Sequence, residues 1–367
     1  MGERYVYDLS KEEWAEFLSG EPKYRAEQLY DALHKGILFE KINIPKALKS
    51  RISSEFVTDL PEVVKELTSK DGTIKFLLKL HDGELIECVL LKQDYGNTVC
   101  ISTQVGCKMG CAFCASGADG FVRNLSAGEM LAQVMLAQRA SLRADAKQSR
   151  PAEPALHIVL MGSGEPLDNF DNVIRFLALT EVGARHISLS TAGIVPKIKE
   201  FADLGLQVNL CISLHAPTDE VRQKIMPIAK RWSIAELIDA AKYFFEKTKR
   251  RVIFEYSLID GVNCSPEQAV QLARLIKGFP AHVNLICLNR LCEEGAARRG
   301  NPEQNLQPPS REAAMKFMDA LIKAGASCTM RRSRGDDIMA ACGQLACRQR
   351  KTINMKNETR ATALHDG

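Results

Sequence analysis

Three cysteines lie within eight residues, in the segment Cys107-Lys-Met-Gly-Cys111-Ala-Phe-Cys114. Thiols clustered at this spacing are typical of metal ligands. A structural zinc site takes four ligands, usually as two separated CxxC pairs, and no second pair follows here. A [4Fe–4S] cluster normally takes four cysteines, so three would leave one iron open to a substrate or cofactor. The alternatives to such a cluster are a zinc site and three cysteines buried in a loop.

A glycine-rich turn, Met161–Leu167, is the second candidate binding element. It directly follows an apolar run, and glycines there let backbone approach a ligand closely. Gly164 and Glu165 are therefore candidates for holding the amino group of a cofactor. A cluster with one open iron at the end of a barrel strand indicates radical S-adenosyl-L-methionine chemistry. The alternative interpretation of the turn is an ordinary strand-to-helix connection.

Polar residues recur at the ends of later predicted strands. Ser190 ends one strand, Ser213-Leu214-His215 ends the next, and Asn289 follows a third. The carboxyl ends of barrel strands carry active sites, so these residues could contact the ribose or adenine of a cofactor. Singly, each is also a common helix N-cap or turn residue. Their recurrence at successive strand ends favours a binding role.

Two isolated cysteines and one carboxylate have no evident role from their types alone. Cys100 lies on the strand that leads to the cysteine cluster, and Cys342 lies near the end of the chain. The residues alone favour a small buried apolar side chain at both positions. Glu87, on a predicted strand, would by itself be a solvent-facing carboxylate, with Cys88 on the opposite face.

The elements that must position these residues begin with a helical segment, residues 1 to about 65. Ser10 and Glu13 form a capping box, and apolar residues then repeat at helical spacing. The helices expected here are Lys11–Ser19 and Tyr24–Leu33. An Asp-Gly turn at residues 82–83 then predicts a hairpin. Its strands are expected at Thr73–Leu80 and Leu85–Leu91.

Strands and helices alternate from about residue 98. The predicted strands are Val99–Thr103, Leu156–Met161, Ile187–Ser190, Val208–Ser213, Val252–Leu258, Val283–Leu288 and Ser327–Arg331. One predicted helix begins at the capping box Ser126–Glu129. Five more are predicted at Asn172–Leu179, Thr218–Ile225, Ser233–Lys247, Pro266–Lys277 and Ser310–Ala324. Six or seven βα units imply a parallel sheet with helical crossovers. We expect an α/β fold: a partial (β/α)6 barrel with an N-terminal helical accessory domain.

The expected parts are a helical module at 1–70, a hairpin extension at 71–97, the barrel at 98–346 and a basic tail at 347–367. The segment Glu293–Pro309 is rich in Gly, Pro and charge, which predicts a mobile loop. No apolar run reaches the ~18 residues of a membrane-spanning helix. The N-terminus lacks the apolar core of a signal peptide. A cytoplasmic protein without a membrane partner is therefore expected.

Composition narrows the class of protein further. The 367 residues are 46% hydrophobic and 26% charged, which is ordinary for a globular protein and argues against wholesale disorder. The formal net charge of +4 permits a nucleic-acid partner without proving one. Twelve cysteines would not form six structural disulfides in a reducing compartment, so some of them bind metal, do chemistry or pack as small apolar groups.

Taken in order, the motifs resemble those of the RlmN/Cfr family of radical S-adenosylmethionine RNA methyltransferases. The resemblance covers residues 24–346, and the entry segment Pro22–Ala26 is also similar. The segments that carry it are Cys100–Cys107 with the cluster motif, Arg123–Leu125, Gly164–Leu167, Leu189–Thr191, Ser213–Pro217 and Arg334–Gln344. The chain departs from the family at Cys287, where proline is frequent, and in the long loop with Cys292. Neither cysteine is assigned a role.

The resemblance implies two cofactors, a [4Fe–4S] cluster and S-adenosyl-L-methionine. The implied cluster ligands are Cys107, Cys111 and Cys114. The implied contacts to S-adenosylmethionine are Gly164, Glu165, Ser190, Ser213, Leu214, His215 and Asn289.

The resemblance also implies a route through a protein thioether. Carbon 2 of adenine is electron-poor and cannot displace a methyl group from a sulfonium, whereas a thiolate can. Cys342 is implied to be methylated first, and a 5′-deoxyadenosyl radical then removes a hydrogen from that methyl group. The carbon radical adds to the adenine, and Cys100 attacks the sulfur of Cys342 to form a transient disulfide. Glu87 is the implied acceptor of the ring proton.

The implied substrates are an adenosine in the peptidyl-transferase region of 23S rRNA and the adenosine beside the anticodon of some tRNAs. Residues 1–70 are then expected to bind RNA, and an electron donor such as flavodoxin is expected as a partner. Methylation at carbon 8 of the same rRNA adenosine, which confers antibiotic resistance, shares every motif above. Carbon 2 is favoured because the housekeeping branch is the commoner one.

Two other classes of protein stay open. A non-catalytic iron–sulfur or zinc protein that binds RNA would need neither Cys100 and Cys342 nor the Gly164–Leu167 motif. A radical activating enzyme acting on a protein glycine would have no use for the two extra cysteines. Basic runs at residues 247–251 and 331–334 are either solvated helix ends or phosphate contacts.

Overall fold

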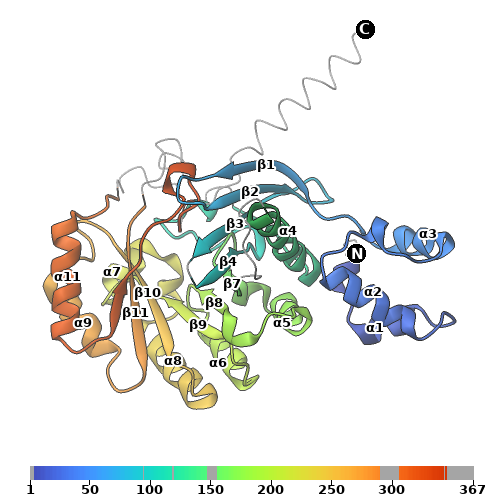
Figure 1. Ribbon diagram of the computed structural model, residues 1–367. Helices are drawn as coiled ribbons and strands as arrows, with labels where there is room; N and C mark the ends of the chain where they lie inside the picture. The colour runs from blue at the N-terminus through green and yellow to red at the C-terminus, as the bar shows by residue number, and fades with distance from the viewer. Residues whose placement is uncertain are drawn as a thin grey trace, which may run out of the picture.

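The computed structural model describes residues 4–93, 95–117, 120–146, 155–289, 306–342 and 344. The expected loop at 293–309 lies largely outside these residues, and Cys292 and the tail at 347–367 lie outside them entirely. The chain opens with three helices to one side of a large sheet (Figure 1). They are α1 (Lys11–Phe17), α2 (Tyr24–His34) and α3 (Lys46–Glu55). The capping box at Ser10 and Glu13 is present, as predicted.

Four antiparallel strands follow: β1 (Glu62–Thr68), β2 (Ile74–Lys79), β3 (Leu85–Gln93) and β4 (Gly96–Cys100). The predicted hairpin is β2 and β3. The expectation of helix as far as residue 65 is wrong, because Glu62–Thr68 pairs with β2 along its length. Most side chains of β1 are exposed. An edge strand of this kind is held by hydrogen bonds to its neighbour. Its sequence lacks the apolar alternation from which a strand is predicted.

The sheet continues in parallel from β4, so that one ten-stranded sheet has the order β1-β2-β3-β4-β7-β8-β9-β10-β11-β12. The further strands are β7 (Leu156–Leu160), β8 (Ile187–Thr191), β9 (Asn209–Ser213), β10 (Val252–Leu258), β11 (Ala281–Cys287) and β12 (Cys328–Met330). Each of the seven predicted strands of this region has a counterpart, but the first is displaced: β4 is Gly96–Cys100, whereas Val99–Thr103 was predicted. Within the described residues β1 and β12 are the two ends of this order and do not pair with each other, so the barrel is partial, as expected.

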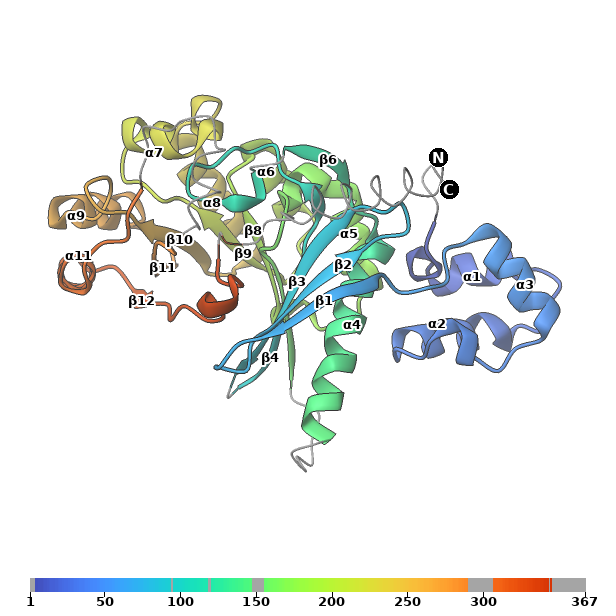
Figure 2. The same ribbon diagram turned by 90° about the horizontal axis from the view of Figure 1, so that it is seen from above.

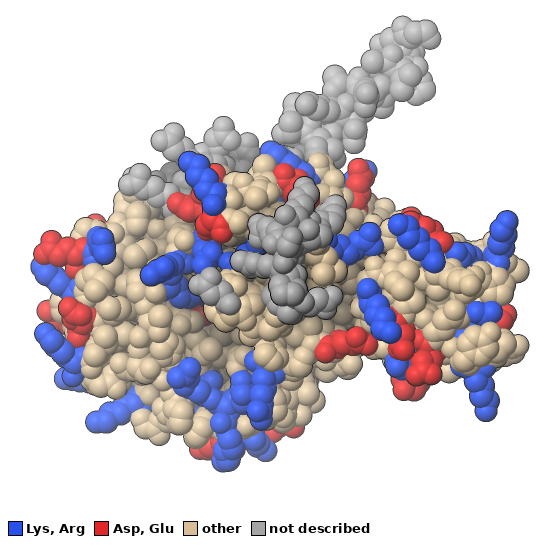
Figure 3. Space-filling model, in the orientation of Figure 1, with Lys and Arg blue, Asp and Glu red and all other residues tan. Residues whose placement is uncertain are grey.

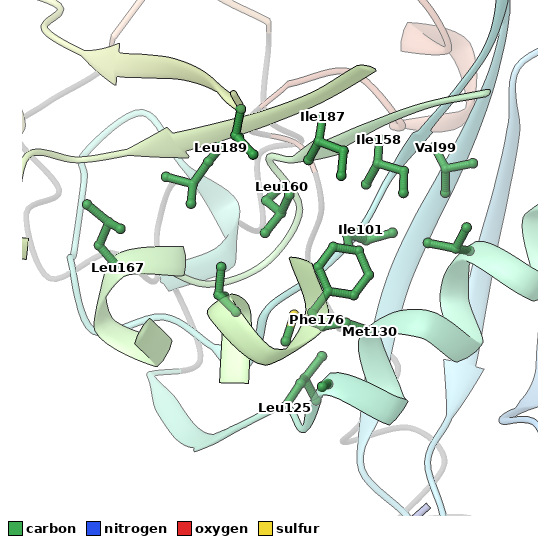
Figure 4. Close-up of a cluster of buried hydrophobic side chains, with 14 of the residues drawn as sticks. Val99, Ile101, Leu125, Met130, Ile158, Leu160, Leu167, Phe176, Ile187 and Leu189 are labelled. Carbon is green, nitrogen blue, oxygen red and sulfur yellow. The ribbon is translucent and has the colours of Figure 1, made fainter. Parts of the chain in front are cut away.

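Helices connect the parallel strands and cover the outer face of the sheet (Figure 2). They are α4 (Ala127–Ala146), α5 (Phe170–Leu179), α6 (Val195–Asp203), α7 (Asp219–Ile225), α8 (Ile234–Thr248), α9 (Pro266–Leu275) and α11 (Arg311–Lys323). Helix α6 was not among the predicted helices. Figure 4 shows the core between sheet and helices, where Ile101 and Leu160 face Phe176 and Met130. No helix of the described residues is long and apolar enough to span a bilayer.

Candidate active site

The three clustered cysteines lie on a loop that a small hairpin closes. Its strands are β5 (Gln104–Gly106) and β6 (Phe121–Asn124), which the sequence analysis did not predict. The Cys107 amide donates to the Gly120 carbonyl at 3.0 Å. Gly106 has a φ of +75°, and a Cβ there would lie 1.9 Å from the same carbonyl oxygen. Only glycine therefore lets the two strands close the base of the cysteine loop.

The far side of the cysteine loop is anchored on α7. The Ala112 amide donates to the Ile225 carbonyl at 2.9 Å. Met109, Cys111 and Phe113 pack against a small apolar cluster that includes Ile225. The loop is thus fixed at its base by β6 and near its middle by the end of α7.

The Met161–Leu167 turn packs against the strand end that precedes the cysteines. A Cβ on Gly162 would lie 2.6 Å from the Ile101 carbonyl oxygen, and one on Gly164 would lie 2.7 Å from the Gln104 Cβ. These glycines therefore allow two loops to approach each other. Both also line the cavity described below, so the predicted approach to a ligand stays a prediction. The Glu165 amide donates to Gln104 Oε1 at 2.9 Å, which joins the two motifs.

The Glu165 carboxylate is buried and accepts hydrogen bonds from backbone amides. The donors are the amides of Ala192, at 2.6 Å, and Leu167, at 3.1 Å. Burial outweighs these bonds and raises the pKa of Glu165 to about 7. A carboxylate with this pKa would gain from a nearby ammonium group, such as the amino group of S-adenosylmethionine.

A cavity of about 160 Å³ opens at the carboxyl ends of the parallel strands. The expected site residues that line it are Cys107, Cys111, Cys114, Gly164, Glu165, Ser190, Ser213, His215, Asn289 and Cys342. Leu214 is placed differently, because its side chain is fully buried in the main hydrophobic core. Residues from six separate loops and strand ends therefore meet at one edge of the sheet, as a barrel requires.

His215 closes one wall of the cavity in an unusual backbone conformation, with a φ of +55°. Its Nδ1 accepts the Ser257 amide at 2.8 Å, so in the neutral ring the proton lies on Nε2. Burial, with the nearby charge of Arg222, lowers the pKa of His215 to about 3. The ring stacks edge-on against Phe113 of the cysteine loop, with 4.6 Å between centroids. His215 is therefore a neutral hydrogen-bond donor at physiological pH.

The segment that carries Cys342 is held across the cavity mouth. Asn289, after β11, donates to the Cys342 carbonyl at 3.0 Å and accepts the Ser333 hydroxyl at 2.7 Å. Cys100 packs with Val89 and Ala340 in a small apolar cluster beneath the same segment. Burial raises the pKa of the Cys100 thiol to about 12, and the nearby Cys342 thiol adds to the rise. The fold thus brings Cys100 close to the segment that ends in Cys342.

Glu87 of β3 lies on the face of the sheet that also carries Cys100, because Cys100 pairs with Val89, two residues farther along β3. It is buried and forms an ion pair with Lys75 of β2, with 2.7 Å between Oε1 and Nζ. The interpretation as a solvent-facing carboxylate is therefore wrong. Cys88 points to the opposite face, as predicted, where it lies 3.9 Å from the Gln133 carbonyl of α4.

The surroundings of the three cysteines suit an anionic metal cluster. Among the described residues, no three His, Cys, Asp or Glu side chains are grouped closely enough to hold a single metal ion. Arg222, beside the loop, is fully buried, and its Nη1 has no hydrogen-bond partner in the described part of the chain. Its other bonds go to the carbonyls of Leu214, Ala192 and Ser213.

A buried cation bonded to carbonyls is costly unless a negative charge lies nearby. Burial lowers the pKa of Arg222 to about 10, which reflects this cost. Three cysteine thiolates on iron would provide the compensating charge. The residues present therefore fit a [4Fe–4S] cluster bound by Cys107, Cys111 and Cys114.

Two charged residues that line the cavity were not predicted as site residues. Glu255 of β10 is buried, accepts from Asn284 at 2.9 Å and lies 3.5 Å from Arg331. Both Glu255 and Arg331 line the cavity with Cys342. An acidic residue inside the apolar strand Val252–Leu258 was the signal that could have revealed the pair.

The two basic runs take different positions. Arg331 lies in the cavity wall, whereas residues 247–251 precede the amino end of β10, at the opposite edge of the sheet. Figure 3 shows a group of Lys and Arg side chains at this lower edge, where Figure 1 draws α6 and α8. The run at 247–251 therefore cannot contact a phosphate at the cavity mouth.

Comparisons with known proteins agree with this site. The chain matches the Radical SAM superfamily over residues 101–273. It is 46% identical over 352 residues to the probable dual-specificity RNA methyltransferase RlmN of Clostridium perfringens, covering 93% of this chain and 96% of that protein. It is 47% identical over 358 residues to the protein of the same name from Geobacillus kaustophilus, covering 94% and 93%.

A solved structure extends the likeness to the fold. The crystal structure of a radical SAM methyltransferase from Sphaerobacter thermophilus has a TM-score of 0.85 and 40% sequence identity, and covers 93% of this chain and 99% of that one. Likeness of this degree, along nearly the whole chain, goes far beyond a shared barrel. The chain therefore belongs to the RlmN/Cfr family and is a radical S-adenosylmethionine RNA methyltransferase that uses a [4Fe–4S] cluster.

Proposed function

We propose that this enzyme methylates carbon 2 of one adenosine in the peptidyl-transferase centre of 23S rRNA, and the adenosine beside the anticodon of some tRNAs. The observation that carries the proposal is the identity of 44–47% to relatives named dual-specificity RlmN. The position of Cys342 on the wall of the cavity that holds the cluster cysteines supports it. An electron donor such as flavodoxin would be its protein partner. The enzyme would act in the cytoplasm.

When bound, the cluster and S-adenosylmethionine supply a methyl group and a hydrogen-abstracting 5′-deoxyadenosyl radical. The chain's own residues then divide the remaining work. The residues that would hold S-adenosylmethionine line the cavity: Gly164, Glu165, Ser190, Ser213, His215 and Asn289. The neutral Nε2–H of His215 would donate a hydrogen bond there.

Cys342 would carry the methyl group to the adenine as a thioether. Its place on the wall of the cavity that Cys107, Cys111 and Cys114 also line supports this role. Cys100 would attack the Cys342 sulfur, so that a transient disulfide forms between the two cysteines while the bond from that sulfur to the transferred carbon breaks and releases the methylated base. The position of Cys100 beneath the same segment supports this role. Glu87 would accept the proton lost from carbon 2, and the target base would leave its stack to reach these groups.

Nucleoside mass spectrometry tests this function. The reconstituted enzyme is incubated anaerobically with S-adenosylmethionine, a reductant and either 23S rRNA fragments or bulk tRNA. We expect 2-methyladenosine in both RNAs. 8-Methyladenosine in the rRNA would overturn the choice of carbon, and unmodified tRNA would remove the second substrate. Cys342→Ala, which cannot carry the methyl group, is the matched inactive control.

A further inference from the structure

Lys75 is a charged residue in a place that apolar residues normally occupy. It lies in β2, whose other side chains between Ile74 and Leu78 are apolar and buried, and Lys75 itself is 8% exposed. Lysine is almost never buried unless its ammonium is paired, because burying a charge is costly. The partners of this ammonium therefore indicate why a lysine is placed here.

The ammonium of Lys75 contacts two groups that belong to different parts of the proposed machinery. It lies 2.7 Å from Glu87 Oε1 on β3 and donates to the Met339 carbonyl at 3.0 Å. In the sheet register Leu77 pairs with Glu87 and Lys75 pairs with Val89, so Lys75 and Glu87 are diagonal neighbours on one face. Met339 precedes Cys342 by three residues.

The same face of the sheet also holds Cys100. Val89 pairs with Cys100 across β3 and β4, and Ala340 packs on both. Lys75 therefore lies where the Glu87 carboxylate and the segment 335–342 meet. Figures 1 and 2 show this last described segment (red) returning from β12 toward the antiparallel strands.

A separate contact anchors the start of this segment. Ser69 Oγ donates to Asp337 Oδ1 at 2.6 Å, and the Gly335 amide donates to Asp71 Oδ2 at 3.0 Å. The turn between β1 and β2 therefore docks residues 335–337 without using Lys75. Because two independent attachments exist, their effects can be separated by substitution.

We propose that Lys75 is a positioning residue that aims the Glu87 carboxylate at the reacting adenine and holds it in register with the Cys342 segment. The inference rests on the proposed function of Glu87. In the step concerned, the bond between carbon 2 and its hydrogen breaks, the proton passes to Glu87, and the electron pair stays in the ring. The positive charge of Lys75 stays beside Glu87. Its hydrogen bond to the Met339 carbonyl keeps the segment that carries Cys342 at a fixed distance from the Glu87 carboxylate.

The test compares Lys75→Met with Glu87→Gln, Lys75→Arg and Ser69→Ala. Methionine keeps the apolar stem of the side chain and removes its charge. The readouts are S-methylation of Cys342 by intact-protein mass, the covalent RNA–protein adduct on a denaturing gel, and methylated adenosine. For Lys75→Met we expect Cys342 methylation within about twofold of wild type. Methylated adenosine should fall by about 10²-fold, the size of a lost general-base contribution, while the adduct accumulates as in Glu87→Gln.

The other variants sharpen the result. Lys75→Arg should restore most of the product, because arginine can bond to both oxygen partners. Ser69→Ala loosens the segment without touching Glu87, so it should not accumulate adduct. The double variant Lys75→Met/Glu87→Gln should be no slower than Glu87→Gln alone, since the two residues act as one unit. It also carries no unpaired buried charge, which guards against a variant that fails only in folding.

Loss of Cys342 methylation in Lys75→Met, in parallel with loss of product, would overturn the inference and leave Lys75 a purely structural tie. Additive losses in the double variant would overturn it as well. Failure of the underlying function looks different. In that case wild type shows no S-methylated Cys342, or Glu87→Gln forms product at the wild-type rate.

Discussion

At the scale of single residues, the surroundings of His215 decide its charge. The ring lies between β9 and β10 with its Nδ1 bonded to the Ser257 amide, so protonation would break that bond and place a cation near Arg222. The same ring in the unfolded chain has its ordinary pKa of 6.5. The folded state therefore favours the neutral ring.

This difference predicts how stability depends on pH. Burial lowers the pKa of His215 in the folded protein to about 3. Between pH 6.5 and about 3 the unfolded state binds more protons, so the free energy of unfolding falls as the pH falls, by up to ~1.4 kcal/mol per pH unit. His215→Asn, which tolerates a positive φ, should remove this contribution. Urea unfolding of both proteins at pH 7 and pH 5 measures it, and equal pH dependence would contradict the prediction.

At the scale of elements, the β5–β6 hairpin decides whether the cysteine loop closes. Gly106 and Gly120 both have positive φ, +75° and +74°, so alanine is strained at either position. Only at Gly106 would the added Cβ meet a backbone oxygen, that of Gly120, whereas the space around Gly120 is open. The two glycines therefore form a matched pair for a test.

We expect Gly106→Ala to bind clearly less iron per chain after anaerobic reconstitution than Gly120→Ala, because the clash displaces Cys107 from its neighbours. Both variants should keep the barrel, since the hairpin lies outside the ten-stranded sheet. Iron content and far-UV circular dichroism measure the two effects. Equal iron content in the two variants would show that the contact with Gly120 does not organise the loop.

At the scale of the whole molecule, the N-terminal segment is fastened to the barrel by a buried carboxylate. Asp8 accepts the Gly128 amide at 2.6 Å and the Ser126 hydroxyl at 3.1 Å, at the start of α4. Its carbonyl is bonded by Arg175 of α5. On α2, the Tyr30 hydroxyl donates to the Leu179 carbonyl. The helical module is therefore joined to the barrel by polar contacts that cross a long stretch of sequence.

Asp8→Ala should lower the free energy of unfolding by about 2 kcal/mol, because it leaves the buried Gly128 amide without its acceptor. It should also expose the N-terminal helices to limited proteolysis earlier than the barrel. Asp59→Ala, an exposed site in the same module, is the control and should change neither quantity. A shift of similar size in both variants would mean that Asp8 is not the fastening point.

Local patterns in the sequence determined much of this protein. Features that depend on neighbours in the chain can be predicted before the fold is known. They are the helix cap at Ser10, the alternation of strands and helices after residue 98, and the spacing of Cys107, Cys111 and Cys114. The tertiary structure decided the rest. The edge strand β1, the role of the glycines at 162 and 164, and the burial of Glu87 against Lys75 arise from contacts between distant segments. Such contacts leave no local periodicity, because each residue's environment is supplied by a partner that only folding brings near.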